Sequence, residues 1–224
     1  MNNNELTRLF ESAFPFWENL SEWDKETFIH SSECVEYKKG TNIHDGGECT
    51  GVILIKSGAL RLYMLSDEGK EITLYRLFPG DICILSASCV LHTITFDVFI
   101  DAEEDSECVV VGGCAYEGVW QRSDEVKIFT YETALSRFSD VMWVMQQILF
   151  MSMDKRLAIF LLDEISKNGD TVKLTHEQIA KYMGSAREVV SRMLKYFSSE
   201  GIISASRSGG IKILDKKRLR EIAM

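Results

Sequence analysis

Charged side chains near the C-terminus recur at the spacing of one helical face. At about 100° per residue, Arg187, Glu188, Ser191, Arg192 and Lys195 fall on one side of the predicted helix. The apolar residues fall on the opposite side and are expected to pack inward: Val189, Val190, Met193, Leu194, Tyr196 and Phe197. A guanidinium can bond a guanine edge through two parallel hydrogen bonds, and a carboxylate can accept a hydrogen bond from cytosine N4. The face therefore has the chemistry needed to read bases in a major groove.

A tight turn between two short helices must position this face. Thr175 followed by Gln178, and Ser185 followed by Glu188, both fit the capping-box pattern of a helix start. Gly184 stands just past the first helix, where a positive φ is needed to cap its last carbonyls. Because caps, turn and spacing agree, we predict a helix-turn-helix. That context favours base reading over the alternative, a charged face that is merely solvated.

A hairpin follows the two helices. The runs I-I-S-A (202–205) and I-K-I-L (211–214) flank the turn sequence R-S-G-G. Such a hairpin can act as a wing, and Arg207, Ser208 and Lys212 are the side chains on it that could reach phosphates.

Charge is distributed unevenly along the chain of 224 residues. The net charge is -9, but residues 1–151 carry -14 and residues 152–224 carry +5. A basic third can neutralise phosphates locally even in an acidic protein. The sequence shows no export signal, and its most apolar stretch, 141–153, is short and contains Gln146 and Gln147. We therefore expect a cytoplasmic protein without a membrane span, with its six cysteines as reduced thiols.

Short β-rich runs and glycine turns fill the region from Cys34 to about Val111. The glycines at 47, 58, 69 and 80 recur at intervals of 11 residues. The predicted strands include 52–56, 59–65, 71–77, 93–100 and 107–111. Strands repeated at such short intervals are typical of an antiparallel sandwich or barrel.

A long amphipathic helix is predicted from about Ser123. Its apolar residues recur at alternating intervals of three and four: Ile128, Tyr131, Leu135, Phe138, Met142, Met145 and Leu149. The stripe is widened on one flank by Ala134, Val141 and Ile148. It either covers the barrel or joins two copies of the chain, and its width, with Trp143 and Val144 added, favours dimerisation. A new helix at 154–165 implies a hinge near Ser152.

Barrel, long helix and winged helix-turn-helix, in that order, resemble the Crp/Fnr family of bacterial transcription regulators. R-E-V-V-S-R (187–192) is similar to the family's R-E-x-V-S-R recognition helix. The run K-S-G-A-L-R-L-Y…D-E-G-K-E-I-T-L…F-P-G-D, within 56–81, resembles its effector domain. The resemblance covers almost the whole chain and implies an α+β fold. Its parts would be an antiparallel β-roll or jelly-roll effector domain (1–127), a dimerisation helix (128–151) and a winged helix-turn-helix (152–224).

The resemblance also assigns roles to residues. Arg187, Glu188 and Arg192 would read the bases of a palindromic operator. Contacts to the DNA backbone would come from Thr175, Ser185, Ser191, Lys195, Arg207, Ser208 and Lys212. The homodimer would form through Ile128, Leu135, Phe138, Met142, Met145 and Leu149. RNA polymerase would be a further partner of an activator, while the sequence leaves the operator, the effector and the sign of regulation open.

The effector domain departs from relatives that bind cyclic nucleotides. Those relatives carry a Glu for the ribose and an Arg-Ser or Arg-Thr pair for the cyclic phosphate, whereas residues 82–95 here read I-C-I-L-S-A-S-C-V-L-H-T-I-T. No Lys or Arg occurs between Arg76 and Arg122. Because a buried phosphate needs a charge-assisted partner, we expect a small effector other than cAMP. The candidate pocket residues are Cys83, Leu85, Ser86, Ser88, Cys89 and His92.

Two features of this segment could serve other ligands. A helix N-terminus near Ser86 and Ser88 would offer N–H groups to a small anion. His92, close to Cys89, is a candidate haem ligand.

Three alternatives to a ligand-responsive regulator stay open. A thiol, metal or haem sensor would use the effector-domain cysteines and histidine: Cys83, Cys89, Cys108, Cys114 and His92. Cysteines are common core residues, however, and no C-x-x-C is present, so we predict no iron-sulfur cluster and no resident cofactor. A cupin-type metalloenzyme is disfavoured because only His44 and His92 lie in the β region. A constitutive repressor with a purely structural barrel is the third alternative.

Overall fold

The computed structural model describes residues 2–224 except 48, 88–89, 91–95 and 206–209. The chain divides into two compact units. The first comprises Met1–Leu65 and Leu74–Val141, and the second comprises Ser66–Thr73 and Met142–Met224.

Two four-stranded sheets form the centre of the first unit. Their strand orders are β1-β8-β3-β6 and β2-β7-β4-β5. The strands are β1 (Ser32–Tyr37), β2 (Asn42–Asp45), β3 (Val52–Ser57), β4 (Leu60–Leu65), β5 (Glu71–Leu77), β6 (Ile82–Cys83), β7 (Phe99–Ala102) and β8 (Ser106–Val111). Strand β8 lies antiparallel between β1 and β3, and β7 lies antiparallel between β2 and β4. An inner core from both sheets includes Ile53, Leu62, Ile100 and Cys108, which confirms the predicted antiparallel β-roll.

Some of the predicted strand and turn boundaries were wrong. Of the strand predicted at 93–100, residues 93–95 lie outside the described part of the chain and 96–98 are not in a strand. The strand β7 occupies Phe99–Ala102, where it pairs with Leu60–Tyr63 of β4. The glycines at 58, 69 and 80 have φ values of 85°, 77° and 92°, as turns require, but at the first predicted turn the positive φ belongs to Gly46 rather than Gly47.

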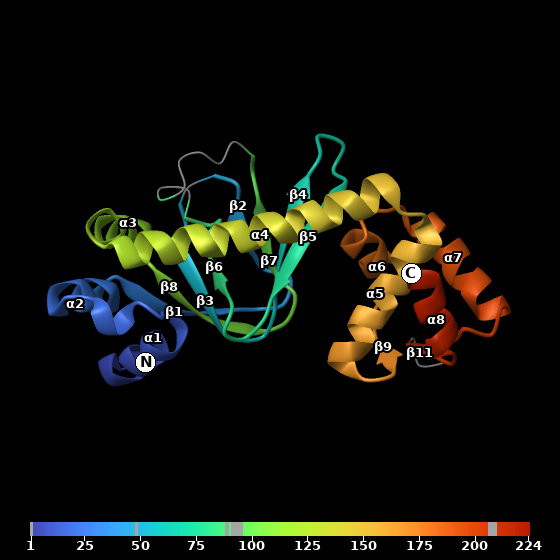
Figure 1. Ribbon diagram of the computed structural model, residues 1–224, viewed down its shortest axis with the longest axis horizontal. Helices are drawn as coiled ribbons and strands as arrows, with labels where there is room; N and C mark the ends of the chain where they lie inside the picture. Colours follow the sequence, from blue (N-terminus) through green and yellow to red (C-terminus); the bar gives the residue numbers. More distant parts are fainter. Residues whose placement is uncertain (1, 48, 88–89, 91–95, 206–209) are drawn as a thin grey trace. The chain divides into compact units, whose positions relative to one another are not determined.

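Helices outside the predicted set cover one sheet of the roll. They are α1 (Asn3–Ala13), the short 3-10 helix η1 (Trp17–Asn19), α2 (Glu22–His30) and α3 (Gly113–Arg122), and α1 to α3 gather at one end of the roll (Figure 1). Their aromatic side chains, among them Phe10, Trp17, Phe28 and Tyr116, pack with Val52 and Val109 in an outer core. The sheet is therefore apolar on both faces.

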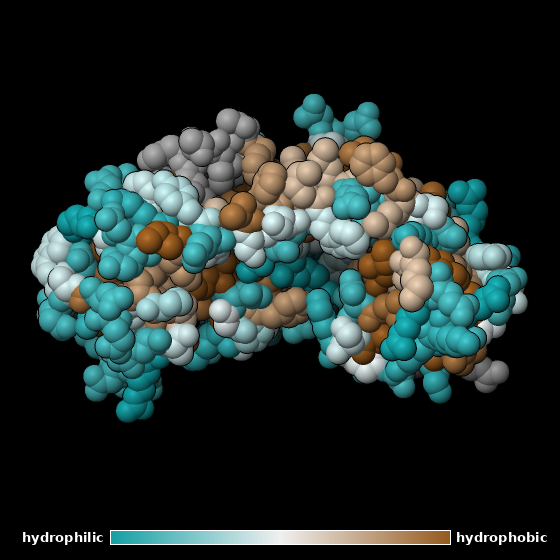
Figure 2. Space-filling model, viewed as in Figure 1, coloured by the Kyte–Doolittle hydropathy of each residue, from teal (hydrophilic) through white to brown (hydrophobic). Residues whose placement is uncertain are grey.

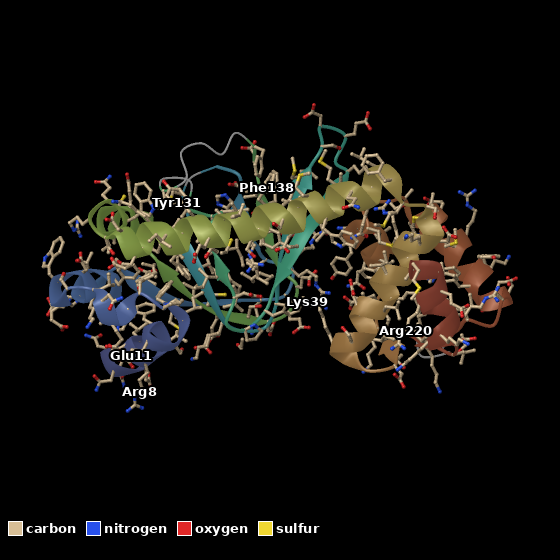
Figure 3. The ribbon with its side chains drawn as sticks, in the orientation of Figure 1. Arg8, Glu11, Lys39, Tyr131, Phe138 and Arg220 are labelled. Carbon is tan, nitrogen blue, oxygen red and sulfur yellow. The ribbon has the colours of Figure 1, made fainter. Side chains whose placement is uncertain are left out.

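The long helix α4 (Asp124–Phe150) starts before residue 128 and turns a narrow face inward. Val126 and Thr130 are buried, and Phe129 and Ala134 pack against the outer core. The seven residues of the main stripe point away from both cores, with Leu135 65% and Phe138 59% exposed, whereas Ala134 and Val141 on its flank pack against the outer and inner cores. Apolar surface gathers over the second half of α4 (Figure 2), and Tyr131 and Phe138 lie two turns apart on it (Figure 3). The main stripe therefore does not cover the barrel, and only its flank does.

The second unit is a helical domain with a small sheet. Its elements are α5 (Met153–Asn168), β9 (Thr171–Val172), α6 (His176–Tyr182), α7 (Arg187–Ser199), β10 (Ile203–Ala205), β11 (Ile211–Ile213) and α8 (Lys216–Ala223). Ser152 is the N-cap of α5, so a new helix does start where the hinge was predicted, while the hinge itself stays a prediction. The core of this unit includes Leu157, Leu161, Val190, Leu194 and Phe197. Within the described parts of the chain, no helix is both long and apolar enough to cross a membrane.

Candidate nucleic-acid interface

The first helix of the predicted pair begins with the expected capping box. Gln178 N donates to Thr175 Oγ1 at 3.1 Å, and Thr175 N donates to Gln178 Oε1 at 2.9 Å. Helix α6 ends at Tyr182 with Met183 as its C-cap, and Gly184 follows with a φ of 55°. This geometry turns the chain sharply into α7, which confirms the helix-turn-helix.

The second predicted capping box, formed by Ser185 and Glu188, is absent. The N-cap of α7 is Ala186, whose side chain cannot accept a hydrogen bond. The Ser185 hydroxyl instead faces α5 and lies 3.8 Å from Met153 Sδ. The backbone N–H groups of Val189 and Val190 both bond Ala186 O, so the helix starts one residue later than the motif suggested. Ser185 is half-buried, and its hydroxyl gives no support to a phosphate contact.

Helix α7 separates an apolar face from a charged one. Val190, Leu194 and Phe197 are buried, while the charged residues of the predicted reading face are all exposed: Arg187, Glu188, Arg192 and Lys195. Among the residues that the structure describes, none of these four has an ion-pair partner. Tyr196 was predicted to pack inward but is 50% exposed, because it lies at the border between the two faces. The charges are thus free to meet a polyanion.

His176 joins this surface without having been singled out in the sequence. Its Nδ1 lies 2.8 Å from Ser191 Oγ, so the first residue of α6 is linked to the reading face of α7. The signal for it was its position directly after the N-cap Thr175, since that end of α6 approaches α7. The hydrogen bond fixes Ser191 at the edge of the charged face.

The predicted wing is present as a hairpin with an added strand. Ile203 pairs with Ile213 and Ser204 pairs with Lys212 in antiparallel register, and β9 extends the sheet beside β11. The Lys212 side chain is exposed. Arg207 and Ser208 lie outside the described residues.

In the effector domain, the described pocket candidates are part of the core. Cys83 and Leu85 are buried among the residues of the inner core. Ser86 is fully buried in a turn, and its hydroxyl donates to Gly51 O at 2.7 Å. The anion-binding helix N-terminus predicted near Ser86 and Ser88 falls mostly on residues outside the described part of the chain and stays a prediction. Ser88, Cys89 and His92 lie outside the described residues.

Two arginines on the strands of the roll form ion pairs with carboxylates. Arg61 Nη2 lies 3.1 Å from Asp101 Oδ2, with its guanidinium over the Tyr63 ring, and Arg76 Nε lies 2.6 Å from Glu103 Oε2.

Arg137, on α4, reaches toward β6 and Tyr75. Its guanidinium lies 3.3 Å from Asp81 and 3.1 Å from Asp140, over the ring of Tyr75. Sequence reasoning missed it because Asp81 is far away along the chain.

The thiols differ sharply in their surroundings. Burial raises the pKa of Cys83, and it raises the pKa of Cys108 to about 12. Cys34 and Cys114 are exposed. In the described parts of the chain, no group of three or more His, Cys, Asp or Glu could hold a metal ion.

Comparison with known proteins matches both units. Residues 34–122 match the model of the cyclic nucleotide-binding domain, and residues 155–222 match that of the Crp-like helix-turn-helix domain. A crystal structure of a protein from Eubacterium rectale, assigned to the Crp/Fnr family of transcriptional regulators, is 48% identical. It superposes with a TM-score of 0.90 over 94% of this chain and 98% of that one.

Two curated regulators are more distant. The cAMP-activated global transcriptional regulator CRP of Haemophilus influenzae is 22% identical over 213 residues, which cover 91% of this chain and 95% of that protein. The transcriptional activator protein anr of Pseudomonas aeruginosa is 28% identical over 200 residues, which cover 83% and 78%. These matches exclude the cupin-type enzyme. The chain belongs to the Crp/Fnr family of DNA-binding transcription regulators, with a cyclic nucleotide-binding-like effector domain.

Proposed function

We propose that the chain is a cytoplasmic homodimeric regulator that binds a palindromic operator through α7 under the control of a small effector. The observation that carries this proposal is the charged face of α7, exposed and without ion pairs among the described residues. Arg187 and Arg192 would bond guanine edges, and Glu188 would accept from cytosine N4. Phosphate contacts would come from Thr175, Ser191, Lys195, Lys212 and, at the wing tip, Arg207 and Ser208.

The homodimer would form along α4. Seven apolar side chains of the predicted stripe are more than a third exposed in the single chain: Ile128, Tyr131, Leu135, Phe138, Met142, Met145 and Leu149. Their spacing of three and four residues is that of a two-stranded coiled coil. A two-fold axis along α4 would present two copies of α7 to half-sites one helical turn apart. RNA polymerase is a further partner if the protein activates transcription.

The effector is proposed to be a small molecule other than cAMP. No Lys or Arg lies between Arg76 and Arg122, and two arginines on strands of the roll, Arg61 and Arg76, pair with Asp101 and Glu103. A cyclic phosphate would therefore have to displace a carboxylate to reach a guanidinium. Titration calorimetry with cAMP tests this: the expected result is no binding, and a sub-millimolar Kd would contradict it.

The stoichiometry on DNA tests the proposed function directly. A duplex selected from a random pool would be sedimented with the protein in the analytical ultracentrifuge. We expect two protomers on each duplex. One protomer for each duplex would contradict the symmetric dimer, and equal affinity for scrambled duplexes would contradict sequence-specific binding. Repeating the measurement with and without cell extract distinguishes an effector-dependent regulator from a constitutive repressor.

A further inference from the structure

A small cavity lies beside the turn that joins α6 to α7. Its volume is about 100 Å³, and three helices line it. Val144 and Gln147 come from the end of α4, Arg156 and Phe160 from α5, and Tyr182 and Met183 from the end of α6. All of these residues belong to the second unit, so the cavity is separate from the inner core of the β-roll.

Arg156 gives the cavity a positive charge without a counter-ion. Its Nη2 donates to Met183 O, and burial lowers its pKa. No carboxylate pairs with it among the described residues. Asp163 also lines the cavity, but seven residues along α5 place it about 10 Å further along the helix axis, and neither residue perturbs the pKa of the other. A partly buried unpaired cation costs free energy, which a bound anion would offset.

The other walls are apolar and limit the size of the ligand. The rings of Phe160 and Tyr182 stack with their centroids 5.8 Å apart, and Val144 lies on the α4 side. A cavity of roughly 150 Å³ holds benzene, so this smaller one suits a molecule of about five heavy atoms.

We propose that the cavity binds a small monocarboxylate of the size of acetate or propionate. The carboxylate would bond the guanidinium of Arg156, and the alkyl group would lie between Phe160 and Val144. The site is independent of the DNA-binding proposal, because it requires only the cavity and its cation. Since Met183 directly precedes Gly184, an occupied cavity touches the helix-turn-helix itself.

Saturation-transfer NMR with sodium propionate at constant ionic strength tests the proposal. We expect saturable binding with a Kd on the order of 1 mM. Propionamide, which has the same shape without the charge, should bind at least about tenfold more weakly.

Three variants locate the site. Arg156→Gln should abolish propionate binding, and Val144→Phe should abolish it by filling the cavity while leaving Arg156 in place. Arg220→Gln, on the exposed face of α8 (Figure 3), is the matched control and should bind like the parent protein. The proposal is overturned if propionamide binds as well as propionate or if V144F binds propionate normally. V144F decides the question even if R156Q does not fold.

Discussion

Arg187 is the residue whose loss reports most directly on base reading. Arg187→Ala should cost about 1–3 kcal/mol of binding to the preferred duplex and should relax the preference at one G, because a bidentate contact is removed. Fluorescence anisotropy with the preferred duplex and single-base variants measures both effects.

Lys195→Ala is the control for Arg187→Ala. It removes a charge on the same face, and it should weaken binding uniformly across sequences. If Arg187→Ala leaves affinity and base preference unchanged, α7 is not the reading helix.

The cysteines provide a test, also at single residues, of the thiol-sensor alternative. The thiolate is the reactive form, so a raised pKa means slow alkylation at neutral pH, with a rate that rises as the pH approaches that pKa. Native protein treated with iodoacetamide at about pH 8 should therefore be labelled at exposed Cys114, while Cys83 and Cys108 are spared. Mass spectrometry of a proteolytic digest shows the order in which the cysteines are labelled. Labelling of Cys108 as fast as Cys114 would show that the inner core is open.

At the scale of elements, two turn glycines with similar φ values should differ in what they tolerate. A Cβ at Gly69 would meet nothing within 4 Å, whereas one at Gly58 would lie 2.2 Å from Ser106 Oγ and 2.6 Å from Asp105 O. Gly69→Ala should cost about 1 kcal/mol from backbone strain alone. Gly58→Ala should cost about 2–4 kcal/mol, because a steric clash is added. Urea unfolding at one fixed protein concentration compares them, and equal costs would contradict the packing around the β3–β4 turn.

Helix α4 is the proposed interface of the homodimer, which a substitution on its exposed face can test. Leu135→Glu places a charge in the middle of the exposed apolar stripe and should raise the dimer Kd at least about tenfold, or 1.4 kcal/mol. Leu214→Glu is the matched control, since Leu214 is 55% exposed but lies outside α4. Sedimentation velocity across a dilution series separates monomer from dimer. If Leu135→Glu leaves the dimer Kd unchanged, the dimer interface lies on another surface.

The sequence predicted a feature correctly where the residues that determine it are close together along the chain. The Thr175 box, Gly184 and the stripe of α4 are set by short-range spacing, and the structure has all three. The start of β7 was wrong because its length is fixed by pairing with β4, far away along the chain. Arg137 was missed for the same reason, since its partner Asp81 is brought to it only by the fold. The N-cap of α7 was wrong because the Ser185 hydroxyl contacts Met153 on α5, a tertiary contact that the local pattern does not show.

For the molecule as a whole, the excess of positive charge in residues 152–224 predicts that DNA binding weakens as the salt concentration rises. The proposed phosphate contacts include three cations in each protomer, Lys195, Arg207 and Lys212, and hence six in a dimer. Binding should therefore weaken with a slope of about -5 in a plot of log K against log salt. Lys212→Ala should make the slope shallower by about 2, because it removes one contact from each half-site. A slope near zero would contradict binding through phosphates.

Selection of duplexes from a random pool, carried out in parallel with the parent protein and with Arg187→Ala, tests whether α7 reads the bases of a palindromic operator. We expect the parent protein to enrich a palindrome whose half-sites lie about 10–10.5 base pairs apart. We expect Arg187→Ala to lose the preference for a G at one symmetric pair of positions. A pool without a consensus, or the same consensus from both proteins, would contradict base reading by α7.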